Sequence, residues 1–228
     1  MFASLGEPVR LSIVDRLSLA DASPGELAVA FDVPTNLLAH HLGVLEEAGV
    51  VRRVRSEGDR RRTYVQLRLD QELVQTLVGA PVLLHAPRIV FVCTHNSARS
   101  QLAAAAWKRV SSVPTASAGT RPATRIHPRT VAIGARHGLR LARAKTADAA
   151  GVLPPEDLVV AVCDNAYEEY DDVALHWSVP DPVRIDTDAA FERAYQEIHG
   201  RVARLAQATA PAQNTPSCPR GLAQRSQR

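Results

Sequence analysis

The sequence predicts an α/β protein of two domains: an N-terminal winged helix-turn-helix, then a domain with a central parallel sheet and helices on both faces. Two patterns support this. The first third of the chain has the order helix, turn, helix, hairpin, and a later apolar run leads through a polar loop directly into a helix. We expect domains at residues 1–79 and 88–206, and units of about 80 and about 120 residues are ordinary domain sizes.

Capping and spacing signals define the helices of the first domain. Ser23 and Glu26 form a capping box at the start of a short helix that follows an initial run of apolar residues at helical spacing. A further helix is expected from Thr35 to about Ala48, and Gly49 ends it. This last helix occupies the position of a recognition helix, whose exposed start reaches base edges in DNA.

A basic hairpin follows, with strands Val50–Arg55 and Arg60–Leu67 joined by a turn at Ser56–Asp59. Residues 51–68 hold seven Arg and two acidic residues, a local net charge of +5, whereas residues 1–78 as a whole have a net charge of −2. Arginines on a wing neutralise DNA phosphates or enter a minor groove. The alternative for such a hairpin is a solvated sheet edge. The candidate DNA-contacting residues are Thr35, Asn36, His40, Arg52, Arg53, Arg55, Arg60, Arg61 and Arg62.

In the second domain we expect a parallel sheet. The expected strands are Arg88–Cys93, Thr115–Ala118, Leu158–Val162 and a short one near Ala174–Trp177. The helices expected to cover both faces of the sheet are Gln101–Val110, Pro128–His137 and Asp188–Leu205. Cys93 then lies at the carboxyl end of a strand, where open α/β sheets bind their ligands.

The segment from Cys93 to Ser100 carries the strongest chemical signal. Cys93 opens a tight loop and Arg99 closes it, with five residues between them, which is enough to surround one tetrahedral oxyanion. Inward N–H groups and the positive end of the next helix attract an anion and favour a cysteine thiolate. An arginine can hold an oxyanion with two parallel hydrogen bonds. The alternative is a cysteine packed as a small buried hydrophobe.

This segment resembles the phosphate-binding loop of the low-molecular-weight protein tyrosine phosphatase fold, which includes arsenate reductases. Other stretches agree with that family in order and together cover about residues 87–206: Ser117–Thr120, His127–Pro128, Val159–Ala166, His176–Trp177 and Asp181–Pro182. The resemblance implies that Cys93 is the nucleophile, that Arg99 holds the oxyanion, and that Asp181 protonates the leaving oxygen. Ser100 would hold the thiolate by a hydrogen bond, and Asn96 would hold the loop. The implied oxyanion-binding loop is Thr94, His95, Asn96, Ser97 and Ala98.

Within that family, three features favour the arsenate reductases. Gln101 stands where the phosphatases usually carry a proline, and Asn96–Ser97 and His176–Trp177 also resemble the reductases. Arsenate and phosphate are near-isosteres, so the loop alone does not separate them. A phosphatase needs only water for its second step, whereas a reductase needs further thiols to remove the oxidised product.

Cys163 is the candidate resolving thiol, because it stands where thioredoxin-linked reductases have their first resolving cysteine. Tyr170 stands where the second would be, so the shuttle of three cysteines is incomplete. Either Cys163 attacks Cys93 directly and leaves one disulfide for an external reductant, or a small thiol resolves the adduct. Simple packing at the end of a strand is the alternative for Cys163. The resemblance implies no bound cofactor, an external mycothiol, glutathione or thioredoxin system, and a redox partner such as thioredoxin or mycoredoxin.

The stretch from His40 to Val50 resembles the ArsR family of regulators, over about residues 3–78. This implies a double-stranded DNA operator and a homodimer as partners. Arsenite-sensing members carry a Cys-x-Cys pair before the recognition helix, but residues 1–92 contain no cysteine, so no metal site is expected. The family's additional N-terminal helix has no counterpart here. Either the start of the chain is assigned late, or dimerisation uses other surfaces, such as a helix near Gln71–Val78.

Residues 80–87 are expected to form a short linker restrained by prolines, and residues 207–228 a disordered tail rich in Ala, Pro, Gln and Ser. No apolar run reaches the ~18–20 residues of a membrane span, and no signal peptide opens the chain. A reactive thiolate and a DNA-binding unit both suit a reducing cytoplasm, so we expect a cytoplasmic protein without a membrane partner.

Three functions remain open on the sequence. The first is an arsenate reductase fused to a DNA-binding regulator of arsenic response, with arsenate as the oxyanion. The second is a phosphatase for phosphotyrosine-like esters, which would use the same Cys93, Arg99 and Asp181. The third is a non-catalytic regulator in which the loop binds an oxyanion as a signal. The reductase is favoured, because both resemblances indicate arsenic response.

Overall fold

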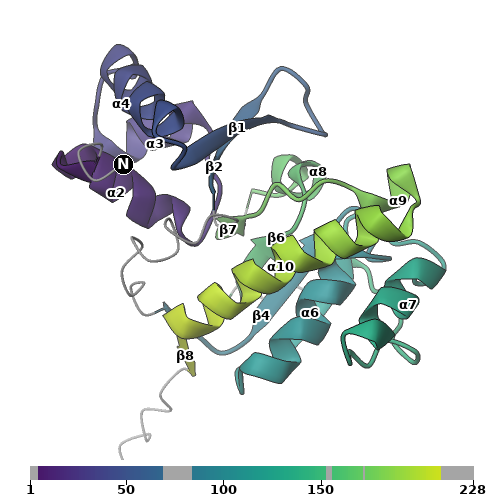
Figure 1. Cartoon of the computed structure of the whole chain (residues 1–228). Coiled ribbons are helices and arrows are strands. Elements are labelled where there is room, and N and C mark those ends of the chain that lie inside the picture. The colour runs from purple at the N-terminus through teal and green to yellow at the C-terminus, as the bar shows by residue number, and fades with distance from the viewer. Residues whose placement is uncertain (1–4, 69–83, 153–155, 172, 212–228) are drawn as a thin grey trace, which may run out of the picture.

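The computed structural model describes residues 5–68, 84–152, 156–171 and 173–211 (Figure 1). The N-terminal unit contains α2 (Pro8–Leu17), α3 (Pro24–Phe31), α4 (Thr35–Glu47) and the antiparallel strands β1 (Val51–Arg55) and β2 (Thr63–Leu67). The expected dimerisation helix near Gln71–Val78 lies outside the described residues.

Local capping explains the N-terminal unit. The predicted capping box is confirmed: the Ser23 hydroxyl accepts from the Glu26 N–H, and the Glu26 carboxylate accepts from the Ser23 N–H. Gly49, with φ of 69°, follows the end of α4 and provides the left-handed conformation that a non-glycine residue adopts at a cost. The second hairpin strand begins later than expected, because the Arg62 N–H bonds back to the Asp59 carbonyl and closes the turn.

The C-terminal unit is built on a parallel sheet with strand order β5-β4-β6-β7. Its strands are β4 (Ile89–Cys93), β5 (Thr115–Gly119), β6 (Leu158–Ala161) and β7 (Leu175–His176). Its helices are α6 (Arg99–Val110), α7 (Pro128–Arg136), the 3-10 turn η1 (Ala149–Gly151), α8 (Asp164–Glu169), α9 (Pro182–Ile185) and α10 (Asp188–Ala208). The predicted fold class, a winged helix-turn-helix joined to a phosphatase-like α/β domain, is confirmed.

The two faces of the sheet are covered unequally. Ile89 and Phe91 of β4 point into the larger core, to which α6, α7 and α10 all contribute. Val90 and Val92 point into a smaller cluster that η1 and α8 cover. The three long helices therefore do not divide between the faces as expected, because the second face is closed by short helices and loops.

The ends of the phosphatase-like unit pair with each other. β3 (Leu84–Ala86) and β8 (Thr209–Pro211) form a two-stranded parallel sheet, with Leu84 opposite Thr209. Residues 84–86 were expected in the linker and residues 209–211 in the tail, so both of those expected segments are shorter than predicted. The rest of the expected tail, residues 212–228, lies outside the described residues.

Polar contacts join the two units. Asp21, only 2% exposed, lies at the centre of one set: its carboxylate accepts from the Ser178 N–H at 2.7 Å and from Gln66 Nε2 at 2.8 Å. The same carboxylate forms an ion pair with Arg201 of α10 at 3.0 Å. The Asp21 N–H donates to the carbonyl of His176, the last residue of β7. One buried side chain thus ties the N-terminal unit to the sheet and to α10.

Replacing Asp21 with Ala should destabilise the whole chain by about 3–5 kcal/mol, because the substitution leaves the buried guanidinium of Arg201 without its main counter-ion. Urea unfolding followed by circular dichroism measures this cost. Asp171→Ala, at an exposed position, is the control and should change the free energy of unfolding by less than about 0.5 kcal/mol. Equal stability of the two variants would contradict this assignment.

Candidate functional site

The loop between β4 and α6 is shaped to hold an anion. Four of its carbonyl oxygens accept hydrogen bonds from backbone N–H groups between residues 120 and 127, outside the loop; they belong to Cys93, Thr94, His95 and Ser97. The N–H and C=O of a trans peptide unit point in opposite directions, so the following N–H groups are directed to the inside of the loop. Together with the positive end of α6, they form a binding site for one oxyanion.

Asn96 holds this loop in shape. It adopts the left-handed conformation with φ of 48°, which asparagine tolerates better than most residues. Its side chain is fully buried and donates to the Ser100 hydroxyl at 2.8 Å. Its amide oxygen accepts from Gln101 Nε2 at 3.0 Å and from the Ala147 N–H at 2.9 Å. The amide therefore links the loop, the first turn of α6 and the segment before η1.

The candidate nucleophile, Cys93, is 2% exposed and lies at the carboxyl end of β4. Its sulfur is 3.0 Å from the Ser100 hydroxyl. Because that hydroxyl already accepts a hydrogen bond from Asn96, its own proton is available to the sulfur. This arrangement suits a thiolate, which accepts hydrogen bonds but donates none.

Arg99 supplies a buried positive charge to the site and is only 3% exposed. Its Nη1 donates to the Val179 carbonyl at 2.9 Å, and its Nη2 lies 3.3 Å from the Asp181 carboxylate. Its Nε has no acceptor among the described residues, so a donor remains for a bound anion. Burial lowers the pKa of Arg99, but nearby Cys163, Asp181 and other acidic groups more than offset this and leave the pKa raised.

Asp181 lies where a general acid would be needed. It is the N-cap of α9, where its Oδ1 accepts from the Val183 N–H at 3.1 Å, and its Oδ2 lies near Arg99. Its side chain is 13% exposed, which leaves it within reach of a group bound in the loop. The structure thus brings together the predicted Cys93, Arg99, Ser100 and Asp181.

Cys163 is the second thiol of the site. It follows β6 and is 1% exposed, in the same buried cluster as Cys93. Its sulfur is 3.5 Å from the Thr94 hydroxyl. Burial raises the pKa of the Cys163 thiol, and the Arg99 guanidinium offsets only part of that effect. Both thiols are free.

The remaining residues of the predicted loop differ in exposure. Thr94, Ser97 and Ala98 are buried with Asn96, whereas the His95 side chain is exposed at the rim. His95 therefore contributes its backbone to the loop, and its imidazole points away from the centre.

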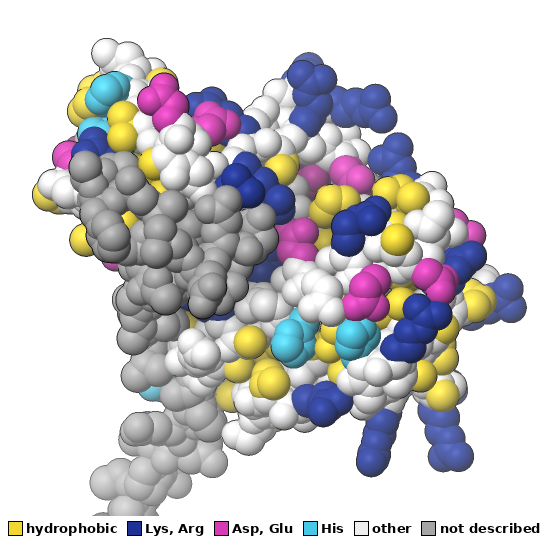
Figure 2. Space-filling model, viewed as in Figure 1, with side chains coloured by type: hydrophobic (Ala, Val, Ile, Leu, Met, Phe, Trp, Pro, Cys, Tyr) yellow, Lys and Arg dark blue, Asp and Glu magenta, His cyan; other side chains and the backbone are white. Residues whose placement is uncertain are grey.

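The predicted DNA-contacting residues are exposed but do not share one face: Arg53 pairs with Glu46 of α4 at 3.2 Å, whereas Arg52, next to it on β1, lies 3.8 Å from Glu197 of α10. Thr35, Asn36 and His40 are exposed on α4, and all six hairpin arginines are exposed as well. Figure 1 places α4 and the β1–β2 hairpin together, with the tip of the hairpin extending toward α8. In Figure 2, Lys and Arg side chains gather over the tip of the hairpin. Contact with DNA by these residues stays a prediction.

Two residues of the site were not assigned a role from the sequence. Gly119 leaves no room for a side chain, because a Cβ would lie 2.8 Å from the Thr94 carbonyl oxygen and 2.9 Å from the Asn96 nitrogen. Its place directly after a strand was the available signal. The other is Glu57, in the turn of the hairpin, whose Oε2 lies 3.5 Å from Arg99 Nη1. A turn residue far away in the sequence carries no local signal of this contact.

Comparison with known families shows which protein family the chain belongs to. Residues 88–214, more than half of the chain, match the family model of low molecular weight phosphotyrosine protein phosphatases. The chain belongs to this family. Residues 5–54 match the model of a helix-turn-helix domain, so a helix-turn-helix unit is fused here to a low molecular weight phosphatase domain, as predicted.

Solved structures similar to this chain include members with different activities. The arsenate reductase from Archaeoglobus fulgidus is 30% identical over 52% of this chain and 98% of its own, with a TM-score of 0.46. The tyrosine phosphatase Wzb from Escherichia coli K30 is 20% identical over 54% and 97%, with a TM-score of 0.48. The YwlE arginine phosphatase from Geobacillus stearothermophilus is 23% identical over 53% and 90%, with a TM-score of 0.44. No curated protein matches the chain.

Two further properties concern only the described part of the chain. It contains no group of three or more His, Cys, Asp or Glu side chains placed to hold a metal ion. None of its helices is long and apolar enough to cross a membrane.

Two substitutions of Asn96 should separate loop shape from backbone strain. Asn96→Gly and Asn96→Ala both remove the amide that ties the loop together, so both should weaken phosphate binding by at least about tenfold. Asn96→Ala should also be less stable than Asn96→Gly by about 1 kcal/mol, because alanine is strained at positive φ. Calorimetric phosphate titration and urea unfolding measure the two effects. Wild-type phosphate affinity in Asn96→Gly would rule out the amide as the loop's support.

Proposed function

We propose that this protein is a thiol-dependent arsenate reductase fused to a DNA-binding regulator of arsenic response. The observation that carries the proposal is the second buried thiol. Cys163 lies in the same buried cluster as Cys93, and its sulfur is 3.5 Å from the hydroxyl of Thr94 in the oxyanion loop. A phosphatase has no use for a second thiol, whereas a reductase needs one to release its product.

The first step would be attack on arsenate. Arsenate binds in the loop against the inward N–H groups and Arg99, and the Cys93 thiolate attacks arsenic. An As–S bond forms while an As–O bond breaks, and Asp181 protonates the departing oxygen so that it leaves as water. Arsenic is still pentavalent at this point, attached to Cys93.

The second step would reduce arsenic. The Cys163 thiolate attacks the sulfur of Cys93, a disulfide forms, and the As–S electron pair stays with arsenic, which leaves as arsenite. Two thiols have then supplied two electrons. An external dithiol, such as reduced thioredoxin or mycoredoxin with mycothiol, regenerates both cysteines by thiol–disulfide exchange. Cys93 is the last residue of β4, and Cys163 lies two residues after Ala161, which ends the neighbouring strand β6 and pairs with Val92.

The family membership keeps a phosphatase as the second candidate. The same Cys93 would attack phosphorus, and water would then hydrolyse the thiophosphate with help from Asp181. Under this alternative Cys163 has no chemical role. A regulator that binds the oxyanion without turnover is the third candidate.

The activity test is arsenite release from arsenate, with thioredoxin, glutathione–glutaredoxin and mycothiol–mycoredoxin systems supplied in parallel. Wild-type protein should release arsenite with at least one system, and Cys93→Ser with none, because the nucleophile is gone. Hydrolysis of an aryl phosphate is measured alongside. Cys93-dependent hydrolysis without arsenite release would move the protein to the phosphatases, and neither activity in a folded protein would favour the regulator.

Cys163→Ser tests the route of the second step. It should lower arsenite turnover at least about a hundredfold with the thioredoxin system, because the disulfide with Cys93 can no longer form. Cys218→Ser, which removes the third cysteine of the sequence, is the matched control and should leave turnover unchanged. Full activity of Cys163→Ser in every system would exclude it as the resolving thiol.

Asp181→Asn tests the general acid. Loss of a positioned acid typically costs about 10²–10⁴-fold in rate, so arsenite release should fall within that range while phosphate still binds. An unchanged rate would show that another group protonates the leaving oxygen.

For the DNA-binding half, we propose that the exposed arginines of the hairpin contact DNA phosphates. Replacing Arg60, Arg61 and Arg62 with Ala should weaken binding to a DNA duplex and reduce the slope of log affinity against log salt by about 0.9 for each phosphate that is no longer neutralised. Fluorescence anisotropy over a series of salt concentrations measures both quantities. An unchanged slope would mean that these arginines do not contact DNA.

A further inference from the structure

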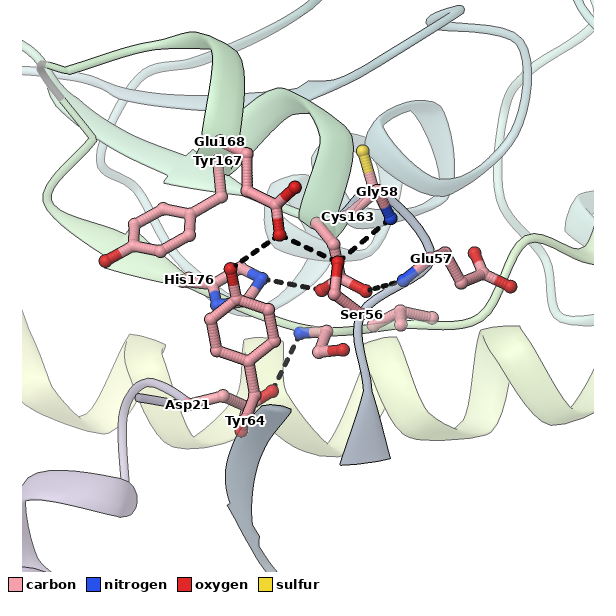
Figure 3. A network of polar contacts seen from close by, with 12 residues as sticks. Asp21, Ser56, Glu57, Gly58, Tyr64, Cys163, Tyr167, Glu168 and His176 are labelled. Carbon is pink, nitrogen blue, oxygen red and sulfur yellow. Dashed lines mark hydrogen bonds and ion pairs between the residues drawn. The ribbon is translucent and has the colours of Figure 1, made fainter. Parts of the chain in front are cut away.

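The turn of the hairpin reaches the mouth of the oxyanion loop. Ser56, Glu57, Gly58 and Asp59 form this segment, which we call the wing turn, and all four are buried or half-buried although they lie at the tip of a hairpin. Figure 3 shows the wing turn facing α8, near Cys163. The contacts on this surface join residues more than a hundred positions apart in the sequence.

Glu57 is the residue of the wing turn that enters the site. Its Oε2 lies 3.5 Å from Arg99 Nη1 and accepts from the Asp181 N–H at 2.9 Å. Its Oε1 lies 4.0 Å from Arg184 of α9. One carboxylate of the DNA-binding unit thus contacts both the candidate oxyanion clamp and the backbone of the candidate general acid.

Anchors on α8 hold the wing turn in this position. The Glu168 carboxylate accepts from the Ser56 hydroxyl and from the Asp59 N–H, each at 2.7 Å, and from the Tyr64 hydroxyl at 2.9 Å (Figure 3). A Cβ at Gly58 would lie 2.4 Å from the same carboxylate, so a larger residue there would displace the Glu168 side chain.

A second anchor joins the wing turn to β7. The Asp164 carboxylate accepts from the Glu57 N–H at 2.8 Å and pairs with His176 at 2.9 Å. Burial raises the pKa of Asp164, but the hydrogen bonds from His176 and from the Glu57 N–H more than offset this and leave it lowered. Asp164 is therefore a charged acceptor at neutral pH, and charged acceptors make the stronger hydrogen bonds.

We propose that Glu57 is a specificity-determining residue of the oxyanion site and that a bound oxyanion competes with it for Arg99. The wing turn narrows the mouth, so the site accepts a free tetrahedral oxyanion in preference to a phosphate attached to a tyrosine side chain. Two anions cannot both neutralise one guanidinium without repelling each other, so oxyanion binding weakens the docking of the wing turn. The inference rests on the oxyanion site of the proposed function but does not depend on reduction of arsenate.

This competition couples oxyanion binding at Arg99 to DNA binding by the hairpin. The base of the hairpin packs against α4 through the apolar core of the N-terminal unit, and the docked wing turn fixes its tip, where the exposed arginines lie. An oxyanion that loosens the wing turn therefore lowers DNA affinity, and by thermodynamic reciprocity DNA lowers oxyanion affinity by the same factor. Couplings of this kind typically amount to about 5- to 150-fold.

The first test is phosphate affinity, measured by calorimetry at fixed salt. Glu57→Gln keeps an acceptor for the Asp181 N–H but removes the charge, so phosphate should bind on the order of tenfold more tightly than to the wild type. Glu169→Gln is the matched control, since Glu169 is an exposed neighbour of Glu168 that pairs with Arg121. It should bind phosphate like the wild type. Unchanged or weaker binding by Glu57→Gln would overturn the proposal.

The second test follows the wing turn itself. Amide hydrogen exchange of the peptide containing Glu57 and Asp59 should speed up in wild-type protein when phosphate is added, because these two N–H groups lose their acceptors on α8. The affinity for a fluorescein-labelled DNA duplex of arbitrary sequence should fall at least about fivefold in the same titration. In Glu57→Gln both responses should shrink. Unaltered exchange and DNA affinity would overturn the coupling.

The two tests of this inference can succeed or fail independently of the test of the proposed function. Phosphate is the probe in both tests, so a protein that releases no arsenite can still show competition with Glu57. Arsenite release by a protein whose phosphate affinity is indifferent to Glu57 would support the reductase and reject this inference.

Discussion

The rest of the site depends on one constraint: the positive charge of the buried Arg99 guanidinium must be neutralised by nearby groups. At 3% exposure it has lost most of its hydration, and a buried charge left without partners is strongly destabilising. The Val179 carbonyl and the carboxylates of Asp181 and Glu57 surround it. The same charge, with the inward N–H groups of the loop, forms the proposed oxyanion site. Stability and substrate binding therefore use one group.

The contact between the two domains is polar where it lies close to this charge. Carboxylates and hydroxyls dominate the contact around the wing turn, with Glu168 and Asp164 as its acceptors. A polar contact of this kind resembles a transient interface between domains more than a continuous core. A substrate that replaces one carboxylate beside Arg99 would shift this contact without leaving the guanidinium unpaired. Around Arg99, the hairpin of the helix-turn-helix unit and the candidate oxyanion site therefore share the same ion pairs.

The features that could be predicted from the sequence are those that depend on residues close together in the chain. The capping box at Ser23, the helix end at Gly49 and the loop from Cys93 to Arg99 each follow from spacing and residue type within a few positions. The Glu57–Arg99 contact spans 42 positions, and Ser-Glu-Gly-Asp is also ordinary turn chemistry, so nothing local distinguishes it. The pairing of β3 with β8 and the gathering of the long helices on one face depend likewise on packing between distant segments, which periodicity does not specify.

The account depends on Arg99 as a two-pronged oxyanion clamp, and calorimetric titration of inorganic phosphate into wild type and Arg99→Lys tests this most directly. Lysine keeps the charge but lacks the planar fork. The account predicts a single phosphate bound per wild-type chain and an affinity at least about tenfold weaker in Arg99→Lys, with the fold intact by circular dichroism. Equal affinities in the two proteins would contradict it, because the site would then be using the charge alone or a different part of the surface.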